Sequence, residues 1–362
     1  MNAYLYPITT AAWQFPLIAL LLTMPYVIYC YRKFGSVSVL RSFILFSMLF
    51  YLQCAFYLCI LPLPDPATVS ASTKPFLNLV PFQNIIDFLE KSSFDVSNPR
   101  TWLVAMRESY FLEPMFNLLL LLPFGIYLAY YFKSSLKKVL LFSFLLSLLF
   151  ELTQLTGLWG VYSRPYRLFD VNDLMLNTLG GVLGYAVFRG FLKFLPSRDS
   201  IDAKSVERGR KVSFTRRTVA LAFDGVAMLL IVVPVARLTD VNALNTGLVT
   251  MFIYFPLFSV ILRGSTPGKA IVRIKVAAIG KKPRLLTLTL ILRCTLRNAA
   301  APLFLWLASL VSSLAAQYLP VIVELLLLLL LGADFLHSLK KGKRLWYERL
   351  TRTQNVSTNK TR

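Results

Sequence analysis

The chain has 362 residues, of which 56% are hydrophobic and only 15% are charged, and its formal net charge is +22. A soluble globular protein carries about 25% charged residues, so this composition, with its long apolar runs, excludes a single soluble core. A basic excess can indicate nucleic acid, but here Lys and Arg lie between apolar runs, which is typical of cytoplasmic loops facing anionic lipid. The predicted partners are membrane lipids and not nucleic acid.

Nine apolar runs are long enough to cross a membrane, since a spanning helix needs roughly 20 mostly apolar residues. The predicted spans are residues 10–31, 38–61, 114–132, 139–157, 171–193, 217–236, 247–263, 298–316 and 320–338. The predicted fold class is therefore all-α. We expect a polytopic membrane protein with about nine transmembrane helices in two bundles, five plus four.

Basic residues assign the two sides of the membrane. The segments after spans 1, 3, 5 and 7, and the segment after the last span, are rich in Lys and Arg and are predicted to be cytoplasmic. The N-terminus is then outside and the C-terminus inside a bacterial-type inner membrane. The first 31 residues have no basic n-region and are interpreted as a spanning helix, not a cleavable signal peptide.

A polar, charged segment divides the chain into two halves. The predicted organisation is a membrane domain over 1–195, a cytoplasmic linker over 196–212, a second membrane domain over 213–356 and a tail over 357–362. The long external loop 62–113 begins with three prolines. Within it, Pro81–Leu89 has the spacing of a short amphipathic helix at the membrane interface.

The cysteines do not predict a metal or disulfide framework. Cys30, Cys54, Cys59 and Cys294 lie in or beside apolar runs without a Cys-x-x-Cys pair, and His337 is the only histidine. No cofactor is predicted, and carboxylates alone leave a hard cation such as Mg²⁺ open.

Polar residues gather at the end of span 4 and the start of span 5. A carboxylate within lipid needs a partner or water, and Glu151 shares a helical face with Gln154 three residues on. Asp173 and Asn177 begin a stripe of span 5 that continues through Gly180 and Gly184, where a neighbouring helix can approach closely. The predicted ligand-binding residues are Glu151, Gln154, Arg164, Arg167, Asp170, Asp173 and Asn177.

These residues are expected to form an outward-facing pocket in which Arg167 meets Glu151 or an aspartate. Two other interpretations stay open: the glycines serve only helix packing, and the charged residues form a structural ion-pair network without a ligand.

Three motifs in this half resemble those of VanZ-like proteins. They are Asn78-Leu-Val-Pro81-Phe82, the segment from Asn117 to Pro123-Phe124-Gly125, and the series from Glu151-x-x-Gln154 through Arg167, Asp170, Asp173 and Asn177 to Gly184. The resemblance covers about residues 75–190. It implies a membrane protein linked to resistance to glycopeptide antibiotics of the teicoplanin type.

The second half carries Arg217 and Asp224 on one helical face, two turns apart. The later Gly264-Ser-Thr-Pro-Gly268-Lys269 has one residue too few between its glycines for a nucleotide-binding phosphate loop. Together these segments resemble an RDD domain, with Glu348 where the family carries an Asp. The resemblance suggests transport of ions or small solutes, with Arg217, Asp224 and Glu324 as a possible ion pathway; a structural pair is the alternative.

The predicted function is non-enzymatic recognition at the outer leaflet, in which the protein contributes to glycopeptide resistance or envelope maintenance. A lipid-linked cell-wall precursor or a lipoglycopeptide is the expected ligand. One alternative is an ion or small-solute transporter that uses buried acids. Another is an enzyme acting on a lipid-linked envelope substrate, although no His or Cys lies in the polar cluster. The sequence does not indicate the oligomeric state.

The alternation of Lys and Arg predicts that loop 62–113 is external and linker 196–212 cytoplasmic. A membrane-impermeant thiol reagent added to intact cells should label Ser92→Cys and spare Ser205→Cys, with unsubstituted protein as the background. The opposite labelling pattern contradicts this topology.

Overall fold

The computed structural model describes residues 2–71, 73, 75–191, 195–239, 243–280, 286–298 and 344–359. The described chain divides into two compact units, one formed by Met1–Thr23 and Val39–Ile201 and the other by Met24–Ser38 and Asp202–Arg362. The long first helix is therefore shared, because its N-terminal part belongs to the first unit and its C-terminal part to the second.

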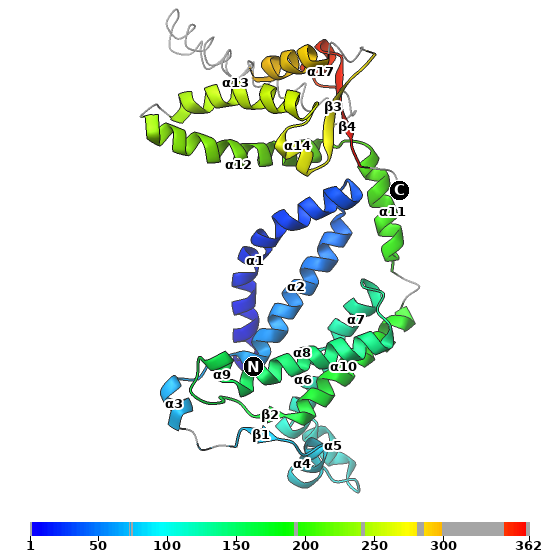
Figure 1. The fold of residues 1–362 in the computed structure, drawn as a ribbon. Coiled ribbons are helices and arrows are strands. Elements are labelled where there is room, and N and C mark those ends of the chain that lie inside the picture. Colours follow the sequence, from blue (N-terminus) through cyan, green and yellow to red (C-terminus); the bar gives the residue numbers. More distant parts are fainter. Residues whose placement is uncertain are drawn as a thin grey trace, which may run out of the picture. The chain divides into compact units, whose positions relative to one another are not determined.

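The first unit is built from apolar helices joined by short elements (Figure 1). The long helices are α1 (Asn2–Phe34), α2 (Val39–Ile60), α6 (Ser109–Leu120), α7 (Leu122–Tyr130), α8 (Leu136–Leu155) and α10 (Val171–Phe191). The short elements are α3 (Pro66–Ala71), β1 (Leu77–Asn78), α4 (Gln83–Lys91), α5 (Pro99–Ala105), α9 (Gly157–Gly160) and β2 (Phe169–Asp170). β1 and β2 pair in parallel. The short helix predicted near Pro81–Leu89 is present as α4.

The third predicted span is interrupted. α6 ends at Leu120 and α7 begins at Leu122, with Leu121 completely buried between them. Pro123 follows in the first turn of α7 and has no N–H to donate to the preceding turn, which accounts for the break.

The second unit combines helices with a small sheet. α11 (Arg198–Arg210) crosses the boundary between the units, and α12 (Phe214–Thr239), α13 (Ala243–Ile261), α14 (Pro267–Ile271), a helix over 286–298 and α17 (Trp346–Leu350) follow. β3 (Ile274–Ala278) pairs antiparallel with β4 (Thr353–Ser357). Because β4 includes Ser357, the expected tail at 357–362 begins inside this sheet.

The all-α prediction holds for most of the chain but missed both two-stranded sheets. In β3 the alternate residues Ile274 and Val276 are buried. Such a short period-two pattern is weak by itself, and the partner of β3 lies about 80 residues farther along the chain.

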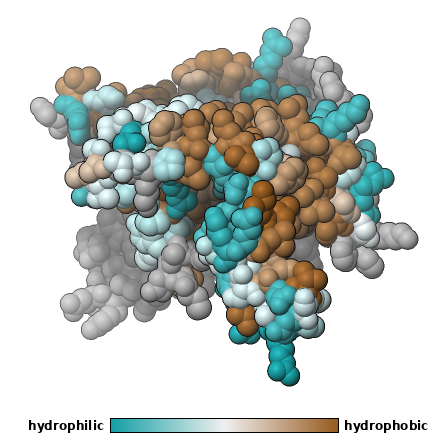
Figure 2. All heavy atoms as spheres, turned by 90° about the horizontal axis from the view of Figure 1, so that it is seen from below, coloured by the Kyte–Doolittle hydropathy of each residue, from teal (hydrophilic) through white to brown (hydrophobic). Residues whose placement is uncertain are grey.

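Five helices in the described residues are long and apolar enough to cross a membrane, namely Leu5–Phe34, Val39–Ile60, Ser109–Tyr130, Leu136–Leu155 and Phe214–Thr239. α10 and α13 are helical where spans were predicted but are not among the five. The predicted spans at 298–316 and 320–338 fall outside the described residues except for Asn298, so the predicted total of nine stays a prediction. The surface of these helices is apolar, as at Leu21 and Leu230, and Figure 2 shows broad hydrophobic areas on one face of the molecule.

The backbone of α10 packs directly against α6, α7 and α8 at three glycines. A Cβ placed on Gly180, Gly181 or Gly184 would lie 1.9 to 2.0 Å from an oxygen of α6, α8 or α7, respectively. The close approach that the glycine stripe predicted is therefore present, and Gly181 extends it to a second face of α10.

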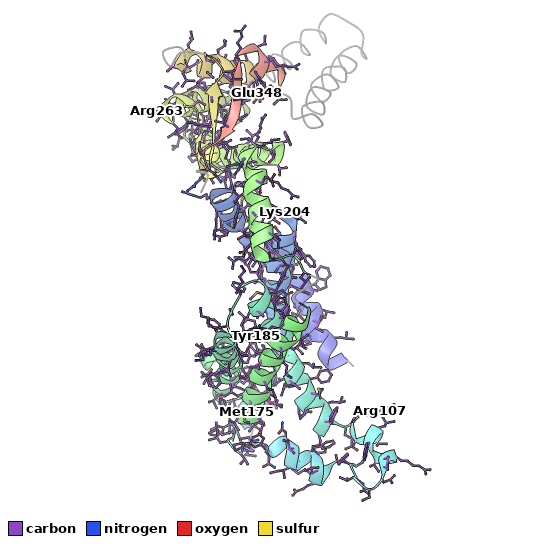
Figure 3. The ribbon with its side chains drawn as sticks, turned by 90° about the vertical axis from the view of Figure 1, so that its right-hand side faces the viewer. Arg107, Met175, Tyr185, Lys204, Arg263 and Glu348 are labelled. Atoms are coloured by element: carbon purple, nitrogen blue, oxygen red, sulfur yellow. The ribbon has the colours of Figure 1, made fainter. Side chains whose placement is uncertain are left out.

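The structure also refines the labelling probes. Ser205 is 2% exposed, so burial alone would protect a cysteine there from either side. The exposed Ser97 in the loop and the exposed Lys204 on α11 (Figure 3) are the appropriate positions for the same experiment.

Alanine substitutions on α10 test the close packing. Gly184→Ala places its methyl group 2.0 Å from the Leu122 carbonyl oxygen, whereas Gly190→Ala meets nothing within 4 Å. We expect Gly184→Ala to lower the free energy of unfolding by about 1–3 kcal/mol through overpacking. Gly190→Ala should be neutral or stabilising by up to about 1 kcal/mol, because alanine favours helix more than glycine. Thermal unfolding of the purified protein in detergent measures both, and equal effects would contradict the packing.

Candidate functional site

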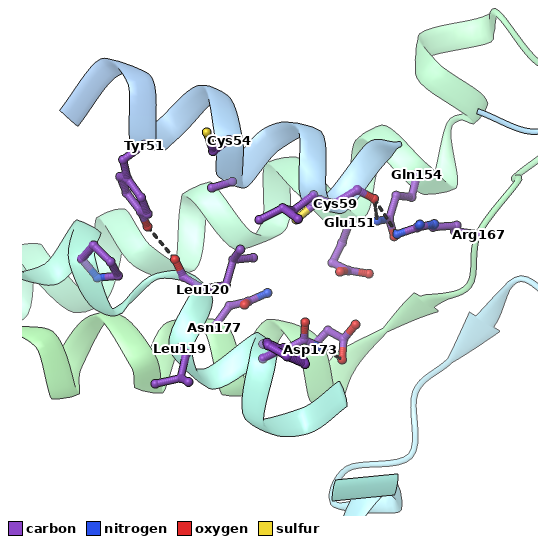
Figure 4. Close-up of a pocket in the computed structure, with 15 residues that line it drawn as sticks. Tyr51, Cys54, Cys59, Leu119, Leu120, Glu151, Gln154, Arg167, Asp173 and Asn177 are labelled. Carbon is purple, nitrogen blue, oxygen red and sulfur yellow. Dashed lines mark hydrogen bonds between the residues drawn. The ribbon is translucent and has the colours of Figure 1, made fainter. Parts of the chain in front are cut away.

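A cavity of about 430 Å³ opens within the first unit, between α2, α6, α7, α8 and α10. Its wall is apolar along α2, α6 and α7, where Tyr51, Leu58 and Leu120 contribute. It is polar where α8 and α10 meet the loop between them. The residues that make the polar end are Glu151, Gln154, Arg167, Asp173 and Asn177, with Asn117 of α6 (Figure 4). Five of the seven predicted ligand-binding residues thus line one cavity.

Two carboxylates face this cavity. Glu151 is 3% exposed, and its Oε2 accepts a hydrogen bond of 3.0 Å from the backbone N–H of Asp170. Asp173 accepts one from Asn117 Nδ2 at 2.5 Å. Among the described residues, no hydrogen bond reaches the second oxygen of either carboxylate, Glu151 Oε1 or Asp173 Oδ2. The two free oxygens are therefore available to a ligand that donates hydrogen bonds or carries positive charge.

Asn177 adds an amide to the same wall. Its Nδ2 donates to Ser147 Oγ at 3.1 Å, while its Oδ1 is buried and has no hydrogen-bond partner in the described structure. A buried polar atom without a partner costs about 1–3 kcal/mol. A ligand donor or a water molecule in the cavity would remove that cost.

Arg167 corrects one prediction. Among the described residues it forms no ion pair with Glu151 or an aspartate; it donates instead to the backbone carbonyls of Cys59 at 2.7 Å and Leu61 at 3.3 Å. These carbonyls lie at the C-terminal end of α2, where helix carbonyls lack partners and the helix dipole favours a cation. Gln154 Nε2 donates to the same Cys59 oxygen at 2.7 Å. Arg167 and Gln154 therefore tie α2 to the polar end of the cavity.

The other two predicted residues do not line the cavity. Asp170 supports it through its backbone N–H, and its carboxylate is turned away to accept from Asn172 N at 2.8 Å and from Asn78 Nδ2 at 3.0 Å. Arg164 is absent from the cavity wall and has interactions of its own. Within the described part of the chain, no three His, Cys, Asp or Glu side chains are grouped so as to hold a metal ion.

Two buried serines beside the site were not predicted. Ser143 and Ser147 lie on α8 at intervals of four that continue to the predicted Glu151, and the three residues meet Gly181, Asn177 and Asp170 of the following segment. The signal was present in the sequence, because polar residues at i, i+4 and i+8 of an apolar helix form one buried stripe.

A different polar network lies in the second unit. Asp224 is 1% exposed and accepts three hydrogen bonds, from Tyr254 Oη at 3.0 Å, Thr266 Oγ1 at 2.5 Å and the Gly268 N–H at 2.7 Å. In a phosphate loop, backbone N–H groups bind the phosphates of a nucleotide. Here the N–H of Gly268 already donates to the Asp224 carboxylate. This geometry agrees with the exclusion of nucleotide binding from the spacing.

Glu348, labelled in Figure 3, is fully buried and is the centre of an ion-pair cluster. Its Oε1 lies 2.7 Å from Arg293 Nη2, and its Oε2 lies 3.3 Å from Arg217 Nη1. Asn355 also donates to it at 2.7 Å. Arg217 therefore pairs with Glu348 rather than with Asp224. Glu324, the third residue of the predicted ion pathway, lies outside the described residues.

Arg216, next to the predicted Arg217, is the more deeply buried of the two and was missed. It donates to the carbonyls of Val272 and Arg273, both at 2.8 Å, and of Gly209 at 3.0 Å. It thereby joins α11 and α12 to the turn between α14 and β3. Sequence spacing gave no reason to prefer one neighbouring arginine over the other.

Apolar helices of spanning length, with polar networks enclosed between them, define a helical membrane protein. Comparison with family models then gives its parts: residues 46–194 match the VanZ/LLP1 family, and residues 211–347 match the RDD family. The chain is a VanZ-like domain followed by an RDD domain, as both resemblances predicted. No curated protein and no solved structure matches the chain.

Removing the charge of Glu348 should destabilise the second unit. Glu348→Gln leaves Arg217 and Arg293 without their shared counter-charge, and breaking a buried ion pair from one side costs about 3–5 kcal/mol. Glu207→Gln on the exposed surface of α11 is the matched control and should be nearly neutral. The midpoint of thermal unfolding in detergent measures the stability of both variants. An unchanged midpoint for Glu348→Gln would contradict the stabilising role of this cluster.

Proposed function

We propose that the VanZ-like domain recognises an amphiphilic ligand at the outer leaflet without chemical conversion, and so lowers the access of lipid-anchored glycopeptides to cell-wall precursors. The observation that carries the proposal is the two-ended cavity of the first unit. One end is apolar, and the other presents two carboxylates and an amide. Such a wall fits a ligand with an acyl or aromatic part beside hydroxyl or amine groups, as in a lipoglycopeptide or a lipid-linked glycan.

The position of the acids supports surface recognition over transport. Glu151 lies near the C-terminal end of α8, and Asp173 lies in the first turn of α10. Both acids therefore belong to the same end of the helix bundle, near the loop that joins these helices. An ion path would instead require acids along the middle of the spans.

The proposed setting follows the distribution of basic residues. The protein would lie in a bacterial-type inner membrane with its N-terminus outside and its C-terminus in the cytoplasm. The loop between α8 and α10 then faces outward, and the polar end of the cavity opens near the headgroups of the outer leaflet.

Antibiotic susceptibility tests the proposal directly. Cells that produce the protein should tolerate more teicoplanin than cells that lack it. Glu151→Gln and Asp173→Asn should return susceptibility towards that of cells without the protein, because each removes a free carboxylate oxygen that a ligand would use. Glu90→Gln, which changes an exposed acid on α4, should keep the tolerance.

Thermal unfolding of the same variants distinguishes a ligand site from a structural network. We expect Asp173→Asn to keep the midpoint of the wild type within a few degrees while tolerance is lost. A large loss of stability together with the loss of tolerance would make the network structural. Full tolerance in both cavity variants would contradict the recognition site.

A further inference from the structure

The RDD domain contains a second, separate cavity of about 260 Å³ with a strongly basic wall. It lies within the second unit, between α12, α14, the helix over 286–298 and the segment around α17 and β4. Four of its lining side chains are cations, namely Arg217, Lys269, Arg293 and Arg297. Neutral polar groups, among them Tyr347 and Asn355, complete the wall.

The described residues neutralise only part of this charge. Asp224 is the one acid among the described lining residues. Glu348 does not line the cavity, but it forms ion pairs with the lining residues Arg217 and Arg293. With Lys269 protonated, four cations against two carboxylates leave a local charge of 4 − 2 = +2. Asp224 forms no ion pair among the described residues, because its oxygens accept from Tyr254, Thr266 and the Gly268 N–H.

Among the described residues, two donors of the wall have no partner. Lys269 donates a hydrogen bond from its backbone N–H to Thr266 Oγ1 but none from Nζ to any residue that the structure describes, and Arg217 Nε is buried without a hydrogen-bond partner. Burial, reinforced by the nearby guanidinium groups of Arg293 and Arg297, lowers the pKa of Lys269 to about 7. Removing cations from water without a counter-charge is costly, so this wall favours an anion.

Contacts with neighbouring residues orient the guanidinium of Arg297, which lines the cavity. Its guanidinium lies 3.9 Å from the centre of the Phe255 ring, and its Nε and Nη2 donate to the Asn298 side chain at 3.1 and 3.0 Å. These contacts fix the plane of the guanidinium without neutralising it. A planar, oriented guanidinium is suited to binding two oxygens of one phosphate group.

We propose that this cavity binds a phosphate group, either as a free phosphate or as the phosphomonoester headgroup of a lipid. The oxygens of a dianionic phosphate supply acceptors for Lys269 and the arginines and cancel the remaining charge of +2. The cavity suits a headgroup-sized anion, and acyl chains would lie outside it. The basic segment over 263–297 was predicted to be cytoplasmic, so the ligand would come from the cell interior or the inner leaflet.

The competing account is an intramolecular counter-charge. Glu324 and Asp334 belong to the segment over 299–343, outside the described residues, and ion pairs from both together would supply the missing negative charge. That account predicts no response to phosphate, which separates it from the proposal.

The first test uses the full-length protein in nonionic detergent. Inorganic phosphate, titrated against chloride at constant ionic strength, should raise the midpoint of thermal unfolding. Lys269→Met should weaken the apparent phosphate affinity at least tenfold, whereas Lys275→Met, an exposed lysine of β3 outside the cavity, should respond as the wild type does. An equal response from both variants would overturn the site.

A second measurement needs no variant, in case Lys269→Met fails to fold. At pH 8 a lysine with a pKa near 7 is largely unprotonated and reacts with amine-directed reagents, and a bound phosphate would return it to the unreactive ammonium form. Phosphate should therefore slow the modification of Lys269 several-fold, with Lys275 in the same sample as reference. Slowing of both lysines alike counts against the proposal, and slowing of neither rules out the free phosphate and leaves the lipid headgroup to the comparison below.

A third experiment, with lipid micelles, distinguishes a free phosphate from a lipid headgroup. Mixed micelles with phosphatidic acid are compared with phosphatidylcholine micelles and with soluble phosphate alone. Protection of Lys269 by soluble phosphate identifies a free anion, and protection only by phosphatidic acid identifies a lipid headgroup. Absence of protection in all three conditions overturns the proposal in both forms.

Discussion

The close approach of α10 to its neighbours is the constraint on which the first unit depends. Glycines place the backbone of α10 against α6, α7 and α8, and this leaves no space between the helices for larger side chains. Some of the polar groups that line the contact bond to one another: Ser147 with Asn177, and Glu151 with the Asp170 N–H. Glu151 and Asn177 also line the cavity, together with residues of α2.

The same three sequence motifs converge because of this packing. Asn78 of β1 reaches Asp170, Asn117 of α6 reaches Asp173, and Asn172 donates to the Val80 carbonyl. Each contact joins segments that are 56 to 92 positions apart in the chain. The site is thus a property of the folded domain, and a polar residue changed in one motif alters the neighbours of another.

Much of this was accessible from the sequence. Apolar run length predicted the helices, and helical spacing placed Glu151 with Gln154 and Asp173 with Asn177. Sequence spacing could not predict the hydrogen-bond partners of a long side chain. Arg167 has acidic residues nearby in the sequence, but it donates to the carbonyls at the end of α2. Nor could it find β3 and β4, whose pairing depends on contacts between distant segments. Glu348, which stands where the resemblance to RDD domains implied an Asp, reaches two arginines.

The sharing of α1 between the two units bears on the order in which the protein is made. Residues 24–38 leave the ribosome long before some of their packing partners: Asn359 Nδ2 donates to the Tyr31 carbonyl across 328 positions. The second unit therefore cannot close until residue 359 has been synthesised, whereas the helices of the first unit can assemble while synthesis continues. Until then the C-terminal part of α1 lacks its final neighbours. A substitution at Asn359 would therefore disturb the packing around Tyr31, which is synthesised 328 positions earlier.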